Sequence, residues 1–331
     1  SGTLAWMTAP GDSPFGILPA DEGLHPHDPE LESWNESIFY DFVSRDGRTA
    51  GHVRVGRMPG QGRVWAWCFL AFDGAWLAYE APFLPLELAR DFDVDAPGFT
   101  FAREIVAPLV DSRTMARGRG VFVSGPRAGE EAPFSFDLRF EALGPCHSIG
   151  DRGVEGHTSD DFETNRFEQP VRVVGEVVID GTSRAVEGFG ERDHSWGPRD
   201  WNIEWTFLAL SGPERQTMAV RVQFDEETFF DTGYLAGSAM RTVEEAEFAL
   251  SIEPSRVAGR VCVRDDAGRE LRGALEPLSQ ARIDASHAFS PPQPSDYRRT
   301  LVRFVPDDGG APLFGFLETN RFPHGFPVPQ D

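Results

Sequence analysis

The chain has 331 residues and a formal net charge of −22 at pH 7. This length suffices for one large domain or two ordinary ones. The acidic balance argues against nucleic acid or anionic membranes as partners, because phosphate binding needs basic patches. The basic residues are all arginine, and the absence of lysine excludes lysine Schiff bases and a P-loop of the usual type.

The cysteines and the chain start indicate a cytoplasmic protein. Cys68, Cys146 and Cys262 are too few and too far apart for a disulfide framework or a zinc site, so we expect buried thiols in a reducing compartment. No run of about 18 apolar residues suggests a membrane span. The segment from Ser1 to Thr3 lacks the basic and apolar regions of a signal peptide. The sequence leaves a homodimer open.

Residues 1–33 are rich in Pro, Gly, Asp and His and predict an irregular arm. His25 and His27 are the one close histidine pair. Without a cysteine or further histidine nearby, an exposed loop is favoured over a metal site. We therefore predict neither a metal nor another cofactor.

Residues 34–160 predict a first β domain. Short runs that alternate, or are apolar, and are rich in aromatic and β-branched residues follow one another, separated by turn signals such as Asp-Gly. About seven strands result, which is the number a small sandwich or barrel needs. Residues 84–92 allow one short helix.

Residues 161–331 predict a second β domain with about ten strands and one short helix at 241–248. The polar stretch 144–161 is the expected boundary between the domains. The string ETNRF at 163–167 recurs at 318–322, and these five residues support two related halves. Regular strands without long helices predict all-β barrels or sandwiches and not a parallel α/β sheet.

The stretch EGFGERDHSWGPRDWNIEW at 187–205 is the densest concentration of chemistry-bearing residues. If it is a strand, Arg192, His194 and Trp196 point one way and Asp193 points the other. Gly-Pro then predicts a turn, and a second alternating strand follows over 201–210. We expect the two strands to form a hairpin with an imidazole beside indoles.

His194 is the first candidate for catalysis, because an imidazole on an interior face suits general acid or base work. The alternative is a core histidine with one satisfied hydrogen bond. Asp193 is a weaker candidate for an acid, and an ion pair with Arg192 or Arg199 is favoured. A bulge would be needed to bring Asp193 to the face of His194.

Tryptophans supply the candidate substrate-binding surface. Indole faces attract cations, although core packing is their commonest role. The candidates for lining a cavity are tryptophans, together with one residue that supplies a hydroxyl and two that supply carboxylates. They are Trp196, Trp201, Trp205, Trp65 and Trp67, then Tyr234, and then Asp231 and Glu36.

The segments 170–201, with EGFGERDHSWGPRDW, and 34–73, with WNES and HVRVGRMP, resemble the carotenoid 1,2-hydratase and AttH-like superfamily. The string RDHSWG is similar to that of an uncharacterised bacterial branch. The resemblance implies two tandem lipocalin-like β-barrels and a hydrophobic small molecule in a barrel mouth. It implies relatives that hydrate isoprenoid double bonds without a cofactor, and distant fungal cyclases of the Diels–Alder type.

Carried over, the resemblance covers His194, Trp196 and Asp193. The downstream Tyr and Asp of the hydratases have no clear equivalent, because Arg221 and Gln223 stand near that distance. We therefore expect a cofactor-independent hydratase, dehydratase, isomerase or cyclase acting on a terpenoid or similar lipophilic compound. The alternatives are a lipophile-binding protein without chemistry and a cyclase that works by pocket shape.

Overall fold

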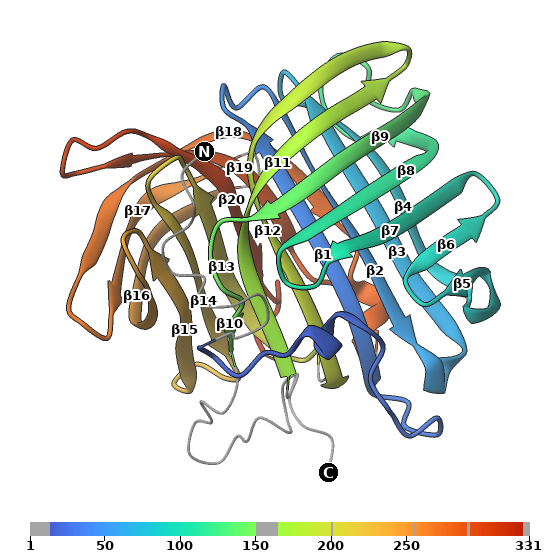
Figure 1. Ribbon diagram of the computed structural model, residues 1–331, viewed down its shortest axis with the longest axis horizontal. Coiled ribbons are helices and arrows are strands. Elements are labelled where there is room, and N and C mark those ends of the chain that lie inside the picture. Colours follow the sequence, from blue (N-terminus) through green and yellow to red (C-terminus); the bar gives the residue numbers. More distant parts are fainter. Residues whose placement is uncertain (1–13, 150–164, 200, 254–255, 290–291, 327–331) are drawn as a thin grey trace. The chain divides into compact units, whose positions relative to one another are not determined.

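The computed structural model describes residues 14–149, 165–199, 201–253, 256–289 and 292–326. In these ranges the regular elements are β-strands and short 3₁₀ segments, so the all-β prediction is confirmed (Figure 1). The 3₁₀ segments are η1 (Pro19–Glu22), η2 (Pro59–Gln61), η3 (Leu86–Leu88) and η5 (Ser286–Ala288). No helix in the described part of the chain is long and apolar enough to cross a membrane.

The chain divides into two units, and the dividing point differs from the expected one. Of the described residues, 14–149 and 165–198 form the first unit, and 199–326 form the second. We expected a second domain that begins at residue 161 and carries the RDHSWG string. The string instead lies in the first unit, because its strand pairs with strands of that unit. Most of the expected boundary loop, 150–161, lies outside the described residues.

The first unit is a twelve-stranded antiparallel sheet that closes on itself. Strand β9 pairs with both β8 and β11, so eight strands form a ring of pairs in the order β1-β2-β3-β4-β8-β9-β11-β12. The strands are β1 (Trp34–Ser44), β2 (Thr49–Met58), β3 (Arg63–Phe72), β4 (Ala75–Pro85), β5 (Ala89–Arg90), β6 (Asp93–Ala96), β7 (Phe99–Ala107), β8 (Asp111–Phe122), β9 (Glu131–Ala142), β10 (His147–Ser148), β11 (Asn165–Ile179) and β12 (Thr182–Pro198).

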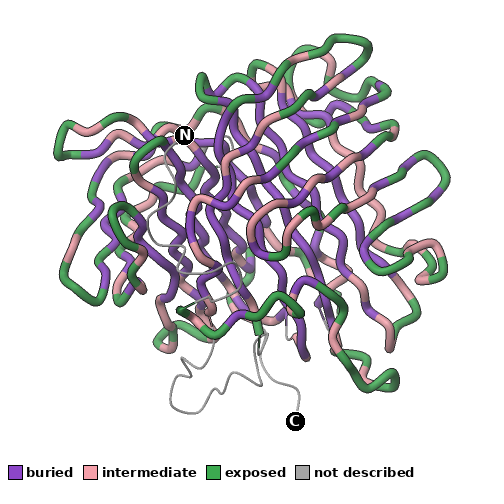
Figure 2. Tube along the Cα trace, in the orientation of Figure 1, coloured by how far each residue is buried: buried purple, intermediate pink, exposed green. Residues whose placement is uncertain are grey.

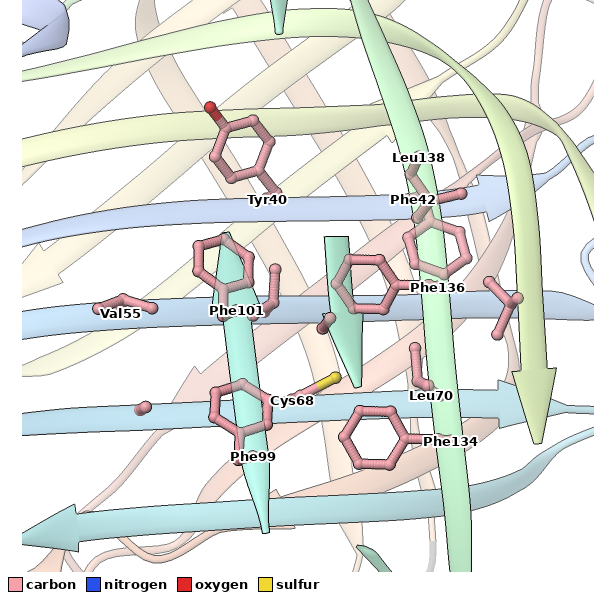
Figure 3. Close-up of a cluster of buried hydrophobic side chains, with 14 of the residues drawn as sticks. Tyr40, Phe42, Val55, Cys68, Leu70, Phe99, Phe101, Phe134, Phe136 and Leu138 are labelled. Atoms are coloured by element: carbon pink, nitrogen blue, oxygen red, sulfur yellow. The ribbon is translucent and has the colours of Figure 1, made fainter. Parts of the chain in front are cut away.

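Alternation fills the inside of this ring with apolar side chains. In β1, Ile38, Tyr40 and Phe42 share one face and are all buried in one hydrophobic cluster. Figure 3 shows how the aromatic rings of β7 and β9, with Phe101 and Phe136 among them, gather with side chains of β1 to β3. Since buried apolar area is the main favourable term in folding, this cluster holds the first unit together.

Asp-Gly turns set the register of the strands that carry the site. Asp180 and Gly181 both have positive φ, 51° and 76°, between the paired residues Ile179 and Thr182. A two-residue loop with positive φ at both positions matches the twist of a hairpin, and Asp-Gly tolerates it best. The turn signal therefore fixes which residues of β11 and β12 face each other.

The second unit is a closed eight-stranded barrel in which each strand pairs with the next and β20 returns to β13. Its strands are β13 (Glu204–Ser211), β14 (Gln216–Gln223), β15 (Phe229–Ala236), β16 (Met240–Glu253), β17 (Arg256–Asp265), β18 (Glu270–Ile283), β19 (Tyr297–Pro306) and β20 (Leu313–Asn320). In both units buried residues follow the strands, while many hairpin tips are exposed (Figure 2).

Both expected short helices are wrong. Residues 241–248 lie inside β16, where a register shift between Val243 and Glu245 adds one residue to the strand. The buried Val243 and Ala246 are therefore three positions apart, which imitates helical spacing. Residues 84–92 contain only the 3₁₀ segment η3 between two strands.

Candidate functional site

Strand pairing in the first unit brings together polar side chains from separate parts of the chain. His194 of β12 lies opposite Ile38 of β1 and Phe167 of β11, so it faces the inside of the ring. Trp196 lies opposite Glu36 of β1. Because alternate residues share a face, Glu36 becomes a neighbour of the His194 ring. Glu36 and Trp196 were candidates, and the register places both beside His194.

One carboxylate oxygen of Glu36 lies between two imidazoles. His194 Nε2 is 3.1 Å and His25 Nδ1 is 2.8 Å from Glu36 Oε1. The backbone N–H of His25 also donates to both Glu36 oxygens, at 3.0 and 3.2 Å. Charge-assisted hydrogen bonds of this kind hold a buried carboxylate in place. We call the side chains of His194, Glu36 and His25 the triad.

The sequence analysis favoured an exposed loop for His25, and the structure corrects this. The His25 side chain is 16% exposed, and its ring stacks on the indole of Trp196 with centroids 3.8 Å apart and planes at 3°. Its Nε2 lies 3.5 Å from Asp21 Oδ1. His27, by contrast, is exposed, and its Nδ1 lies 3.3 Å from the backbone oxygen of His25.

The arm that carries His25 is fixed to the ring by Glu22. The Arg192 guanidinium donates to both Glu22 oxygens at 2.8 and 3.0 Å, and the Leu109 N–H donates at 2.8 Å. Burial alone would raise the pKa of Glu22, but Arg192 and these donors outweigh burial and lower it to about 2. In residues 14–33 the arm has no regular element besides η1, and Glu22 fixes this segment beside the site.

Aromatic rings enclose the His194 imidazole. Phe92 and Phe167 are in T-shaped contact with it, with centroids at 5.2 and 5.8 Å, and Trp196 lies at 5.1 Å. His194 is 1% exposed. An imidazole in such surroundings is poorly solvated, which disfavours its charged form.

Burial and hydrogen bonding set the protonation states of the triad. Burial lowers the pKa of His194 below its ordinary value of 6.5, although the hydrogen bond to Glu36 opposes this. For Glu36, burial raises the pKa, but the hydrogen bonds from His194 and His25 outweigh it and keep the pKa below the ordinary value. At neutral pH the pair is therefore a carboxylate and a neutral imidazole that donates its Nε2–H. His194 Nδ1 then carries a lone pair and has no hydrogen-bond partner in the described chain.

The triad atoms could also hold a metal ion, since the three ligand atoms all lie within 4.8 Å of one another. Tetrahedral zinc with bonds of about 2.0 Å would separate its ligand atoms by about 3.3 Å. The observed separations of 2.8 and 3.1 Å match direct hydrogen bonds better. A metal ligand also usually donates its second ring nitrogen to a partner, which His194 Nδ1 lacks.

Asp193 lies on the opposite face of β12, as alternation predicts. It accepts a hydrogen bond from Arg166 at 2.8 Å, so the ion pair that the structure describes for it is with Arg166. Arg166 also donates to Glu168 at 2.6 Å. Burial raises the pKa of Glu168 well above its ordinary value despite Arg166. Asp193 is thus part of an ion-pair cluster and does not contact the triad.

Trp65 and Trp67 also lie on the face opposite to His194. Ile38 pairs with both His194 and Val55, so Val55 lies on the same face of the sheet as His194. The two tryptophans of β3 pair with the residues on either side of Val55 and therefore lie on the other face. Their rings meet edge-on at 4.8 Å, and the Arg54 guanidinium lies over both. The structure therefore does not bring these tryptophans to the triad.

The expected hairpin between the RDHSWG strand and the next strand is wrong. Strand β12 pairs with β1 and β11, while β13 pairs with β14 and β20. The alternation of side chains along each strand cannot distinguish a hairpin from two consecutive strands that belong to different sheets. Trp201 and Trp205 consequently belong to the second unit, with ring centroids 6.4 Å apart.

The remaining candidates lie in the second unit. Asp231 accepts two hydrogen bonds from Arg221, both at 2.8 Å. Tyr234 is fully buried in β15. The indole N–H of Trp205 donates to Glu318 at 2.7 Å. Each of these groups has a role in the barrel's own packing.

The described part of the first unit contains a cavity of about 950 Å³. Val94, Phe101 and Phe136 contribute apolar surface, and charged residues such as Arg90 and Glu176 complete the lining. This cavity and a smaller one of about 530 Å³ are not lined by His194. An apolar pocket that opens onto the imidazole therefore stays a prediction.

A family model described as Domain of unknown function (DUF7064) matches residues 18–323. No curated protein matches the sequence.

Solved structures share the fold over almost the whole chain. An AttH-like protein from Nitrosomonas europaea has a TM-score of 0.62 at 17% identity, covering 94% of this chain and 98% of its own. CghA has a TM-score of 0.54 at 13% identity, covering 90% and 92%. Kievitone hydratase from Nectria haematococca has a TM-score of 0.52 at 10% identity, covering 94% and 96%. These solved structures share the all-β fold that the resemblance implied, and identities this low show the fold alone.

Proposed function

The chain belongs to the family described as Domain of unknown function (DUF7064), and from that premise we propose that it is a cofactor-independent lyase or isomerase. Its substrate is a terpenoid or similar lipophilic small molecule, on which it moves a proton. The observation that carries the proposal is the neutral His194, held by Glu36 and left with a bare Nδ1. Kievitone hydratase, a structural neighbour, is by its name a hydratase, which supports this class of reaction.

The geometry favours His194 as a base in the first step. A carboxylate that accepts Nε2–H fixes the tautomer and stabilises the imidazolium that forms, as in other carboxylate–histidine pairs. Nδ1 takes a proton from a substrate carbon, and the C–H electrons form a double bond as a neighbouring C–O bond breaks. The imidazolium then returns the proton to the departing oxygen, so water leaves and His194 is neutral again. In an isomerisation the proton returns to another carbon.

The rings around His194 suit a substrate that develops positive charge. Trp196, Phe92 and Phe167 present π systems within about 6 Å of the imidazole, and aromatic faces attract cations. A hydration by alkene protonation would use the same groups in reverse, starting from protonated His194.

One observation favours a different class of function. The cavity of about 950 Å³ is not lined by His194, so a lipophile could bind there without any chemistry. In that case the chain is a ligand-binding protein and the triad fixes the arm to the ring. A cyclase that works by pocket shape would likewise tolerate the loss of His194.

The test is turnover of a terpenoid panel by His194→Ala. The full chain is incubated in D₂O with mono-, sesqui- and tetraterpene alcohols and alkenes, and mass spectrometry detects gain or loss of water and deuterium incorporation. The proposal expects wild-type turnover that falls by about 10²- to 10⁴-fold in His194→Ala, while binding of the compound is kept. The matched control is His27→Ala, which removes an exposed imidazole. Equal turnover in wild type and His194→Ala would remove the assignment.

A further inference from the structure

We propose that His25 and Glu36 form a proton relay that connects the buried His194 to solvent, with Asp21 positioning the His25 ring. The inference rests on the proposed function, because it gives His25 a part in that proton transfer. The contacts form one continuous path: Asp21 Oδ1 to His25 Nε2 is 3.5 Å, His25 Nδ1 to Glu36 Oε1 is 2.8 Å, and Glu36 Oε1 to His194 Nε2 is 3.1 Å.

Exposure falls steadily along this path. The side chains of Asp21 and His25 are 21% and 16% exposed, whereas those of Glu36 and His194 are 3% and 1% exposed. The outer end therefore exchanges protons with water, and the inner end does not. Stacking on Trp196 holds the His25 ring in the plane that points Nδ1 at Glu36.

Other groups near His194 cannot carry a proton away. Arg103 and Arg192 carry guanidinium groups, which only donate hydrogen bonds and offer no lone pair. Phe92, Phe167 and Trp196 have no acceptor atom. Glu22 is a poor acceptor because Arg192 and its other partners lower its pKa to about 2. Glu36 is the carboxylate in direct contact with the imidazole, so the path runs through it.

The relay moves one proton at each contact and leaves the number of protons unchanged overall. When His194 has taken a proton at Nδ1, its Nε2 proton passes to Glu36. Glu36 then gives a proton to His25 Nδ1, which requires the His25 tautomer that carries its proton on Nε2 and has a bare Nδ1. His25 then releases its Nε2 proton to water beside Asp21. Run in reverse, the same steps load His194 with a solvent proton, so that the site serves both removal and addition of water.

The test measures solvent exchange of the His194 Nε2 proton by NMR on the full chain with ¹⁵N-labelled histidine. It needs no substrate, so its failure and that of the proposed function are distinguishable. We expect exchange to slow by about tenfold or more in His25→Gln, and by less in Asp21→Asn. The control is His27→Gln, with the same substitution two positions away on the same arm, and its exchange should match wild type.

Three outcomes would overturn the proposal. Unchanged exchange in His25→Gln would mean that protons reach His194 by another route. Faster exchange in that variant would mean that His25 shields the site and does not conduct protons. Equal slowing in His27→Gln would mean that the effect comes from the arm in general. A thermal unfolding curve for each variant verifies that the chain compared is folded.

Discussion

Both units hold a buried glutamate that accepts hydrogen bonds from two side chains, and they differ in the partners. In the first unit Glu36 lies between two imidazoles. In the second, Glu318 accepts from the Trp205 indole and the Arg299 guanidinium. An imidazole gains and loses protons near neutral pH, whereas indole and guanidinium only donate.

The two buried glutamates show that the partners of a carboxylate decide whether a polar cluster can transfer protons or only stabilises the fold. Arg299 is 2% exposed and its guanidinium lies over the rings of Phe207 and Phe316, so the pair is a packed structural link. In the first unit His194 and Glu36 are as deeply buried, but His194 Nδ1 has no hydrogen-bond partner among the described residues. Titratable partners, and not the buried carboxylate itself, mark the candidate site.

The sharpest way to break the comparison is Glu36→Gln. This variant keeps the shape of the side chain but removes the charge that steadies imidazolium. We expect turnover of the compound identified above to fall by about 10²- to 10⁴-fold. Steady-state kinetics measure the change, and a rate within about threefold of wild type would show that the carboxylate charge is dispensable.

In the second unit, Arg299→Met should act on stability. Removing one partner of a buried ion pair leaves the Glu318 charge without its guanidinium, which typically costs about 3–5 kcal/mol. Denaturant unfolding measures the loss. Arg303→Met is the control, because Arg303 pairs with Glu276 in a half-exposed bridge that should contribute about 1 kcal/mol or less. Similar losses in both variants would contradict the structural role of the buried pair.

The pH dependence of turnover and of stability should also report the titratable imidazole of the first unit, with a smaller effect than the two substitutions. Because the pKa of His194 is lowered below 6.5, the base form dominates at neutral pH. Turnover, measured as kcat/KM, should fall as pH drops through that lowered pKa. The contribution of His194 to stability is complete above about 6.5 and is lost as pH falls from there to the folded-state pKa, since the unfolded chain binds the proton first. A rate that rises on acidification would show that protonated His194 begins the reaction.

The sequence predicted the strands and the face of His194, because both follow from local alternation and turn residues. The Asp180-Gly181 turn and the shared face of His194 and Trp196 are examples. It failed where long-range pairing decides. Nothing local shows that β12 pairs with β1, which brings Glu36 to His194, while the next strand joins another unit. It also missed His25, because only the Glu22–Arg192 link reveals that the arm docks on the ring.

The protonation of the His194 ring at pH 7, read from the ¹⁵N signals of the labelled histidine, tests the central claim most directly. The account predicts a neutral imidazole with the proton on Nε2, bound to Glu36, and a bare Nδ1. An imidazolium, or a neutral ring with its proton on Nδ1, would contradict it.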